Sequence, residues 1–162
     1  LDFSGNFSAD GRFYAVGSSG VRIYDAKTWE QVLVIGDLGS PVMDLALSPD
    51  GAQIAIATAG RLVLVKDVAT GQLVRAWTNF QGRPSVVCWA SSEILLAAAA
   101  RDGGFRVMSV TGDHEGGIST AVESDFLVPT PGDGDITALA VQSGLVVAAG
   151  LGGFIHIWDV IR

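Results

Sequence analysis

Ser48-Pro49-Asp50-Gly51 and, 40 residues earlier, Ser8-Ala9-Asp10-Gly11 are the stretches that decide how this chain folds. Each is a tight-turn sequence, because an aspartate side chain accepts hydrogen bonds from nearby backbone N–H groups and glycine adopts positive φ without steric cost. About 15 residues beyond each turn, a short apolar run ends in an aspartate, first Asp25 and then Asp67. The sequence therefore predicts a repeated unit of about 40 residues.

Two more units follow the same plan. The equivalent runs end at Ser109, 42 residues after Asp67, and at Asp159, 50 residues after Ser109. Short apolar runs alternate with glycine-containing turns throughout, which predicts antiparallel hairpins. Further strands are expected at residues 31–35, 42–47, 53–58, 72–77, 86–89, 94–99, 136–141 and 145–149. No apolar period of about 3.6 residues persists, so helices are not expected.

The repeated unit resembles the WD-repeat family of β-propellers, whose third strand closes with a Trp-Asp pair. That pair stands once, at Trp158-Asp159, whereas Asp25 and Asp67 keep the aspartate alone. The repeat-signature positions are Asp10, Gly11, Asp25, Asp50, Gly51, Asp67, Trp158 and Asp159. The resemblance implies an all-β propeller of about four blades of four antiparallel strands, approximately 1–36, 37–80, 81–130 and 131–162, with the last blade incomplete.

The blades depart from the family's pattern. The family's Gly-His pair is missing, and the aspartate of its tight turn stands only at Asp102, so these degenerate blades must depend on packing. The first strand is expected to be poorly formed, because Gly5 stands where the second unit has Leu45. In the third unit, residues 110–135 are expected to hold an outer strand within 118–128 and long loops.

The number of blades predicts an unfinished ring. Four is the low end for closed propellers, and family members usually have about seven blades. An open arc leaves two apolar blade faces exposed, which single soluble chains rarely tolerate. The sequence therefore predicts part of a larger propeller, as a fragment or portion of a longer chain. The alternative is that a second copy or a partner completes the ring.

Composition narrows the class of protein. Of 162 residues, 49% are hydrophobic and 17% charged, which fits a folded core. The net charge of −7 and the scattered basic residues argue against nucleic acid and anionic membranes as partners. The longest apolar run, residues 94–100, is too short to span a bilayer, and no secretory signal is visible. Cys88 is the only cysteine, so an intracellular location, cytoplasmic or nuclear, is expected.

Residue patterns typical of catalysis are missing from the sequence. His114 has no second histidine or cysteine at metal-ligand spacing. His156 occupies a strand position that aligns with Arg22, Leu64 and Arg106, which favours a packed blade position over a catalytic base. No phosphate-binding loop or nucleophile elbow is present. Asp10 and Asp50 occupy equivalent turns in different blades, too far apart for a catalytic pair. No catalytic, cofactor-binding or metal-binding residue is therefore predicted.

The resemblance implies a non-enzymatic scaffold that binds other proteins in a multiprotein assembly. Its partners would be other proteins of a complex, or the remaining blades of the same propeller. Family geometry gathers certain loops on one face, and the charged contact candidates there are Asp37, Arg61, Arg83, Arg101 and Asp135. Two alternatives remain: a propeller subunit of an RNA-processing or ubiquitin-transfer complex, and an enzymatic propeller with its active site at the channel mouth.

Overall fold

The computed structural model describes residues 4–36, 38–78, 80–99, 102, 104–111, 118–119, 126–129 and 135–159. These residues form strands and turns, and none of them lies in a helix. The all-β prediction is therefore confirmed.

The strands form four separate sheets, in which chain neighbours pair antiparallel. The first sheet contains β1 (Ser4–Phe7), β2 (Phe13–Gly17), β3 (Val21–Asp25) and β4 (Gln31–Ile35). The second contains β5 (Val42–Leu47), β6 (Gln53–Thr58), β7 (Leu62–Asp67), β8 (Leu73–Trp77) and, beside β8, the two-residue β12 (Ile118–Ser119). The third contains β9 (Pro84–Trp89), β10 (Ile94–Ala99), β11 (Gly104–Ser109) and β13 (Phe126–Pro129). The fourth contains β14 (Ile136–Gln142), β15 (Leu145–Gly150) and β16 (Ile155–Asp159).

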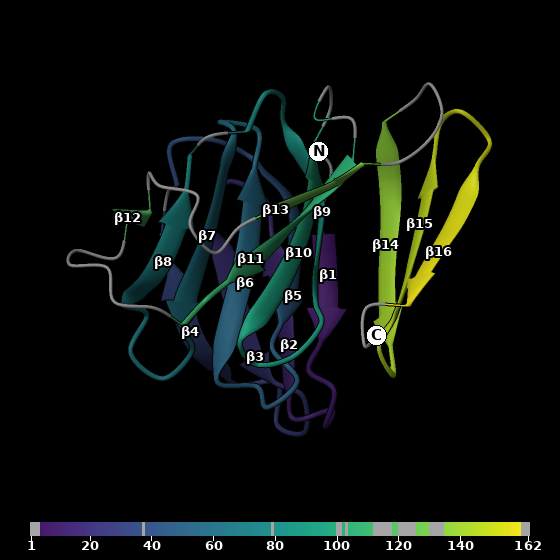
Figure 1. Ribbon diagram of the computed structural model, residues 1–162. Coiled ribbons are helices and arrows are strands. Elements are labelled where there is room, and N and C mark those ends of the chain that lie inside the picture. The colour runs from purple at the N-terminus through teal and green to yellow at the C-terminus, as the bar shows by residue number, and fades with distance from the viewer. Residues whose placement is uncertain are drawn as a thin grey trace.

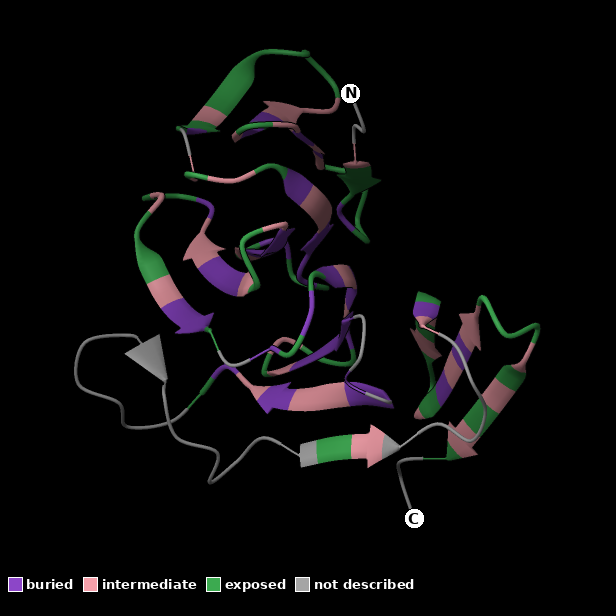
Figure 2. Cartoon of the chain, turned by 90° about the horizontal axis from the view of Figure 1, so that it is seen from above, coloured by how far each residue is buried: buried purple, intermediate pink, exposed green. Residues whose placement is uncertain are grey.

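The sheets follow one another around an arc, with their first strands on the inside. Figure 1 shows the strands of successive sheets standing side by side, and Figure 2 shows the arc from above. Strand β1 lies against β5, β5 against β9, and β9 against β14, whereas β1 and β14 make no contact of comparable extent. This is the arrangement of propeller blades, in which each sheet packs face to face on its chain neighbours.

Strands of the middle sheets are apolar at almost every position, because both of their faces are covered. In β6, Ile54 and Ile56 face the first sheet while Ala55 and Ala57 face the third, and all four side chains are fully buried. The first sheet approaches closely at Gly17, where a Cβ would lie 2.7 Å from Cγ1 of Val42. The alternation along each strand thus decides which neighbouring sheet each residue contacts.

Three apolar clusters join the four sheets, one at each junction. Trp77 and Trp89 belong to the cluster between the second and third sheets, as expected for tryptophans buried between blades. The indole Nε1–H of Trp89 donates a 2.9 Å hydrogen bond to the carbonyl of Ala46 in the neighbouring sheet. Trp29, in the turn after β3, is exposed. The junctions between sheets therefore make up the core.

Two local predictions differ from the structure. The third sheet's outer strand is β13, which reaches Pro129, while β12 (Ile118–Ser119) pairs in parallel with the edge of β8. The outer edge of β8 has backbone N–H and C=O groups that β7 does not pair, so a further strand can form hydrogen bonds there. Strand β1 is well paired with β2 over all four of its residues. Gly5 fits there because a Cβ would collide with the hydroxyl of Tyr14.

Candidate protein-interaction surface

The two ends of the sheets carry different segments. We call one end of the sheets the loop end; there the chain passes from one sheet to the next and turns from each second strand to the third. The loop end comprises the described residues within 18–20, 36–41, 59–61, 78–83, 102, 135 and 151–154. The N–H of Val42 donates a 2.6 Å hydrogen bond to the carbonyl of Ser18 in the preceding sheet. The N–H of Ala59 donates a 2.9 Å bond to the carbonyl of Pro41. The loop end is therefore fixed by backbone hydrogen bonds within and between sheets.

Three of the five predicted contact residues can be placed, and all three lie at the loop end. Arg61 is exposed in the turn between β6 and β7 and has a positive φ of 64°. Arg83 is exposed immediately before β9. Asp135 is half-buried before β14, and its carbonyl accepts a 3.0 Å hydrogen bond from Leu151 N–H. Asp37 and Arg101 lie outside the described residues. A role in protein contacts stays a prediction for all five.

Asp102 anchors the loop end of the third sheet. Its buried carboxylate accepts a 2.9 Å hydrogen bond from the backbone N–H of Gln81 and pairs at 2.9 Å with Nε of Arg106. The guanidinium of Arg106 lies 4.7 Å from the ring centre of Phe80, close enough for a cation–π contact. The loop before β9 and the turn before β11 are thus held together by one buried charge pair.

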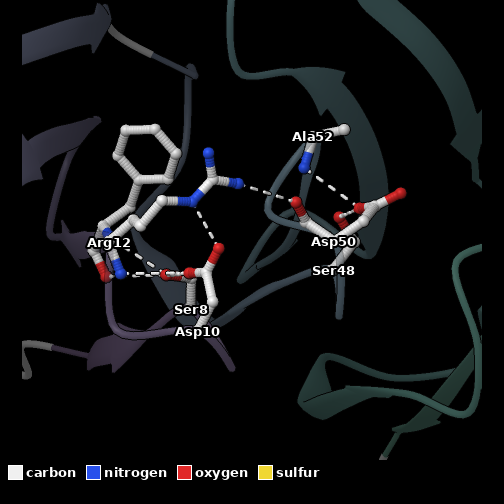
Figure 3. A network of polar contacts seen from close by, with 7 residues as sticks. Ser8, Asp10, Arg12, Ser48, Asp50 and Ala52 are labelled. Carbon is white, nitrogen blue, oxygen red and sulfur yellow. Dashed lines mark hydrogen bonds and ion pairs between the residues drawn. The ribbon is translucent and has the colours of Figure 1, made fainter.

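The opposite end, the turn end, carries the two Asp-Gly turns that first indicated the repeat (Figure 3). Ser8 Oγ donates a 2.7 Å hydrogen bond to Asp10, and Ser48 Oγ donates a 2.6 Å bond to Asp50. Arg12 pairs with Asp10 and also donates from Nη2 to the carbonyl of Asp50, at 3.2 Å. The two turns are therefore alike, and Arg12 joins one blade to the next.

Hydrogen bonds keep these turn carboxylates ionised. The backbone N–H of Arg12, the hydroxyl of Ser8 and the side chain of Arg12 lower the pKa of Asp10 to about 2. The hydroxyl of Ser48 and the N–H of Ala52 lower the pKa of Asp50. Gly11 and Gly51, which follow the aspartates, have φ of 71° and 72°. The signature turns are structural elements, and both carboxylates stay negative at neutral pH.

The remaining signature positions also serve local structure. Asp25 and Asp67 end the third strands of the first two sheets. They accept hydrogen bonds from the backbone N–H groups of Thr28 and Thr70, at 2.9 and 2.8 Å. Trp158 is half-buried, with its ring 5.1 Å from that of Phe105 across the junction of the third and fourth sheets. Asp159 is exposed at the end of β16.

Asp44 joins three sheets, a role that sequence reasoning missed. It lies in β5, and its carboxylate accepts 2.9 Å hydrogen bonds from Ser4 Oγ of β1 and from the N–H of Val87 in β9. Burial raises the pKa of Asp44 despite these two donors. The signal was available, since Asp44 is the only charged residue in the otherwise apolar run at 42–47.

A shallow hollow of about 350 Å³ lies at the turn end, between the first two sheets. It is lined by Arg12, Phe13, Val32, Asp50, Gly51, Ala52, Asp67, Val68 and Ala69. Its ionisable groups are Arg12, Asp50 and Asp67, each of which already makes hydrogen bonds within its own turn or across to the next. The hollow therefore offers a small apolar floor with ionised carboxylates at its rim.

Metal ligands and membrane-spanning elements were sought in the same part of the chain. Among the described residues, no three His, Cys, Asp or Glu side chains gather in a way that could hold a metal ion. Within these residues there is also no helix long and apolar enough to cross a membrane.

Comparison with known proteins defines the fold. No protein-family model matches the sequence, and no curated protein matches it either. The solved structure of U3-55K superposes with a TM-score of 0.80, at 21% identity over 98% of this chain and 46% of that chain. The WD40 repeats of RRP9 give 0.79, at 21% identity over the same shares. The computationally designed Ika4 protein gives 0.71, at 18% identity over 97% of this chain and 89% of that chain.

The fold is that of a WD-repeat β-propeller, as the sequence resemblance predicts. The chain spans slightly less than half the length of U3-55K and of the RRP9 repeats. It spans most of the length of Ika4.

Proposed function

We propose that this chain is a non-enzymatic scaffold that binds other proteins through its loop end. The observation that carries the proposal is that Arg61 and Arg83 are exposed on short loops that are hydrogen-bonded to rigid sheets. Charged side chains on a preorganised surface favour recognition, because little conformational freedom is lost when a partner binds. The loops differ in sequence from sheet to sheet, so the surface can distinguish among partners.

Arg61 and Arg83 put two exposed positive charges at the loop end of an acidic chain, where Asp102 is paired with Arg106 and Asp135 is half-buried. The net charge is −7, whereas Arg61 and Arg83 both project from one end of adjacent sheets. A partner with an acidic segment is the complement of this surface. Membership of an RNA-processing or ubiquitin-transfer complex, and an intracellular location, are narrower predictions of the same proposal.

Protein capture with matched variants tests the proposal. The wild-type chain, the double variant Arg61→Glu/Arg83→Glu and the control Lys27→Glu are immobilised and exposed to the same cell extract. Lys27 is an exposed lysine of the turn end, so its reversal changes net charge without touching the loop end. We expect proteins that the wild type and Lys27→Glu retain in common and that the double variant loses. Equal retention by all three chains would contradict a loop-end binding surface.

An enzymatic propeller is the alternative, and turnover measurements separate the two. Chemistry at the channel mouth would have to use inner-strand polar groups such as Asp44, which is occupied by Ser4 and Val87. Turnover of a small molecule that is lost in Asp44→Asn, with no protein retained, would replace the scaffold proposal.

A further inference from the structure

Within the described residues, the two outermost sheet faces of the arc are mostly apolar, and no other sheet covers them. We call the face of a sheet toward the next sheet in the chain its forward face, and the face toward the preceding sheet its rear face. The forward face of the fourth sheet carries Ala138, Ala140, Val147, Ala149, Ile155 and Ile157. Ile155 and Ile157 are 71% and 66% exposed. Figure 2 shows this sheet as mostly exposed or half-buried, unlike the middle sheets.

The same positions are fully buried inside the arc. Aligning Asp159 with Asp67 places Ile155 and Ile157 in register with Val63 and Val65 of the second sheet. Both valines are 0% exposed, because the third sheet covers them. The fourth sheet thus presents a face built like one that elsewhere in this chain receives the rear face of a blade.

The first sheet presents the matching rear face, which is mostly apolar but carries the exposed Arg22 between Val16 and Val34. Aligning Ser8 with Ser48 places Phe7 in register with Leu47, which packs in the junction of the first two sheets. Phe7 is 54% exposed and Leu47 is 6% exposed. The outer strands align in the same way. Val21 pairs with Ile35 in the first sheet as Val63 pairs with Trp77 in the second, so Val34 is the counterpart of Ala76. Ala76 is buried in the junction of the first two sheets, whereas Val34 is exposed.

We propose that two copies of these 162 residues associate head to tail, the forward face of each fourth sheet packing on the rear face of the other copy's first sheet. All three junctions within the chain already pair a forward face with a rear face, so the contact continues an existing interface. A forward face does not match another forward face, and head-to-tail contacts that close give a ring. A second copy carries both kinds of face, so it can cover both outermost faces of the first.

Chain length supports this occupant. This chain covers 46% of the U3-55K chain at a TM-score of 0.80. Two copies would therefore cover twice 46%, or 92%, of a chain of that length. Ika4 shows that a chain of nearly this length forms the same fold as a protein in its own right. Two copies thus supply about the length of one longer chain of the same fold.

The test is the mass of the purified chain in solution, measured by light scattering over a concentration series. We expect twice the 16.8 kDa of one chain. Ile157→Lys on the forward face and Phe7→Asp on the rear face should each raise the dimer dissociation constant by ~100-fold, since each puts a charge into an apolar junction. Leu151→Lys is the matched control, because Leu151 is 77% exposed in a loop outside both faces and its substitution should leave the dimer intact.

Mixing the two face variants distinguishes head-to-tail pairing from other dimers. In a mixture, the intact forward face of Phe7→Asp meets the intact rear face of Ile157→Lys, and the second junction sets lysine against aspartate. We expect the mixture to regain the dimer that each variant alone loses. Circular dichroism confirms folding of each variant, and Ile155→Lys replaces Ile157→Lys if that chain does not fold. A monomeric wild type, a dimer that survives both face variants, or a mixture that stays monomeric would overturn the proposal.

Discussion

The two buried tryptophans of one junction give a matched test of how the blades are held together. Trp77 and Trp89 lie in the same cluster between the second and third sheets. The indole N–H of Trp89 donates to Ala46, whereas the indole N–H of Trp77 is buried and has no hydrogen-bond partner among the described residues. Replacing either tryptophan by phenylalanine removes the same side-chain volume. The replacement removes a paired N–H at position 89 and an unpaired N–H at position 77.

The expected magnitudes follow from those contacts. Loss of the second ring should cost about 1–2 kcal/mol at either site. Trp89→Phe also removes a buried hydrogen bond and leaves the Ala46 carbonyl without its donor, which adds about 1–2 kcal/mol, for a total of about 3 kcal/mol. Trp77→Phe removes an unpaired buried N–H and so regains about 1 kcal/mol, leaving a net cost of about 1 kcal/mol or less. Arg75 keeps an aromatic face at position 77, since its guanidinium lies 5.4 Å from the ring centre of Trp77.

Urea denaturation followed by far-ultraviolet circular dichroism measures the difference, because that signal comes mainly from the backbone and both variants lose one tryptophan. Equal denaturant slopes in the three chains would show that the midpoints compare the same transition. We expect Trp89→Phe to unfold at clearly lower urea than Trp77→Phe. A Trp77→Phe chain as unstable as Trp89→Phe would refute the reasoning, since packing alone would then decide the stability of the junction.

Three further predictions concern ionisable groups. Burial raises the pKa of Asp44, so ionisation of its carboxyl group opposes folding. The stability of the wild type relative to Asp44→Asn should therefore fall as the pH rises through this raised pKa. Urea midpoints measured for both chains from acid to neutral pH test this. Asp102→Ala should cost about 2–4 kcal/mol, because it leaves Arg106 and the backbone N–H of Gln81 without their buried partner. Asp10→Ala on an exposed turn should lower the urea midpoint much less in the same assay. Burial and the nearby Asp44 charge raise the pKa of Cys88 to about 12. The folded chain should therefore resist thiol reagents at mildly alkaline pH and react once urea unfolds it. Rapid modification of the folded chain would contradict this.

Much of the fold could be predicted from sequence because each blade is built from local hairpins. Asp50-Gly51 sets a turn whose donors and acceptors lie within five residues, as at Ser48 and Gln53. Strand bounds at residues 42–47, 53–58 and 94–99 agree with the prediction, because alternation and flanking turns specify them. The fold follows from features that are visible within one unit of the repeat.

Contacts between units could not be predicted in the same way. Asp44 looks like an isolated polar residue in a strand, and only packing shows that Ser4 and Val87 approach it from two other sheets. The parallel pairing of β12 with β8 likewise joins segments about 40 residues apart without a turn signature. The family's geometry placed the candidate contact residues at one end, but the sequence around Arg61 and Arg83 has no pattern that identifies a partner.

The arc is a row of units with two ends, and this affects how it unfolds. Among the described residues, the apolar clusters join each sheet to its chain neighbours, so the middle sheets have two stabilising junctions and the outer sheets have one. In such a row, opening begins at the ends and moves inward, and the free energy of local opening rises toward the centre. A ring has no ends, so every blade would be held on both sides and unfolding would have to break two junctions at once. Closing the arc would therefore change the cooperativity of unfolding as well as the number of chains in the particle.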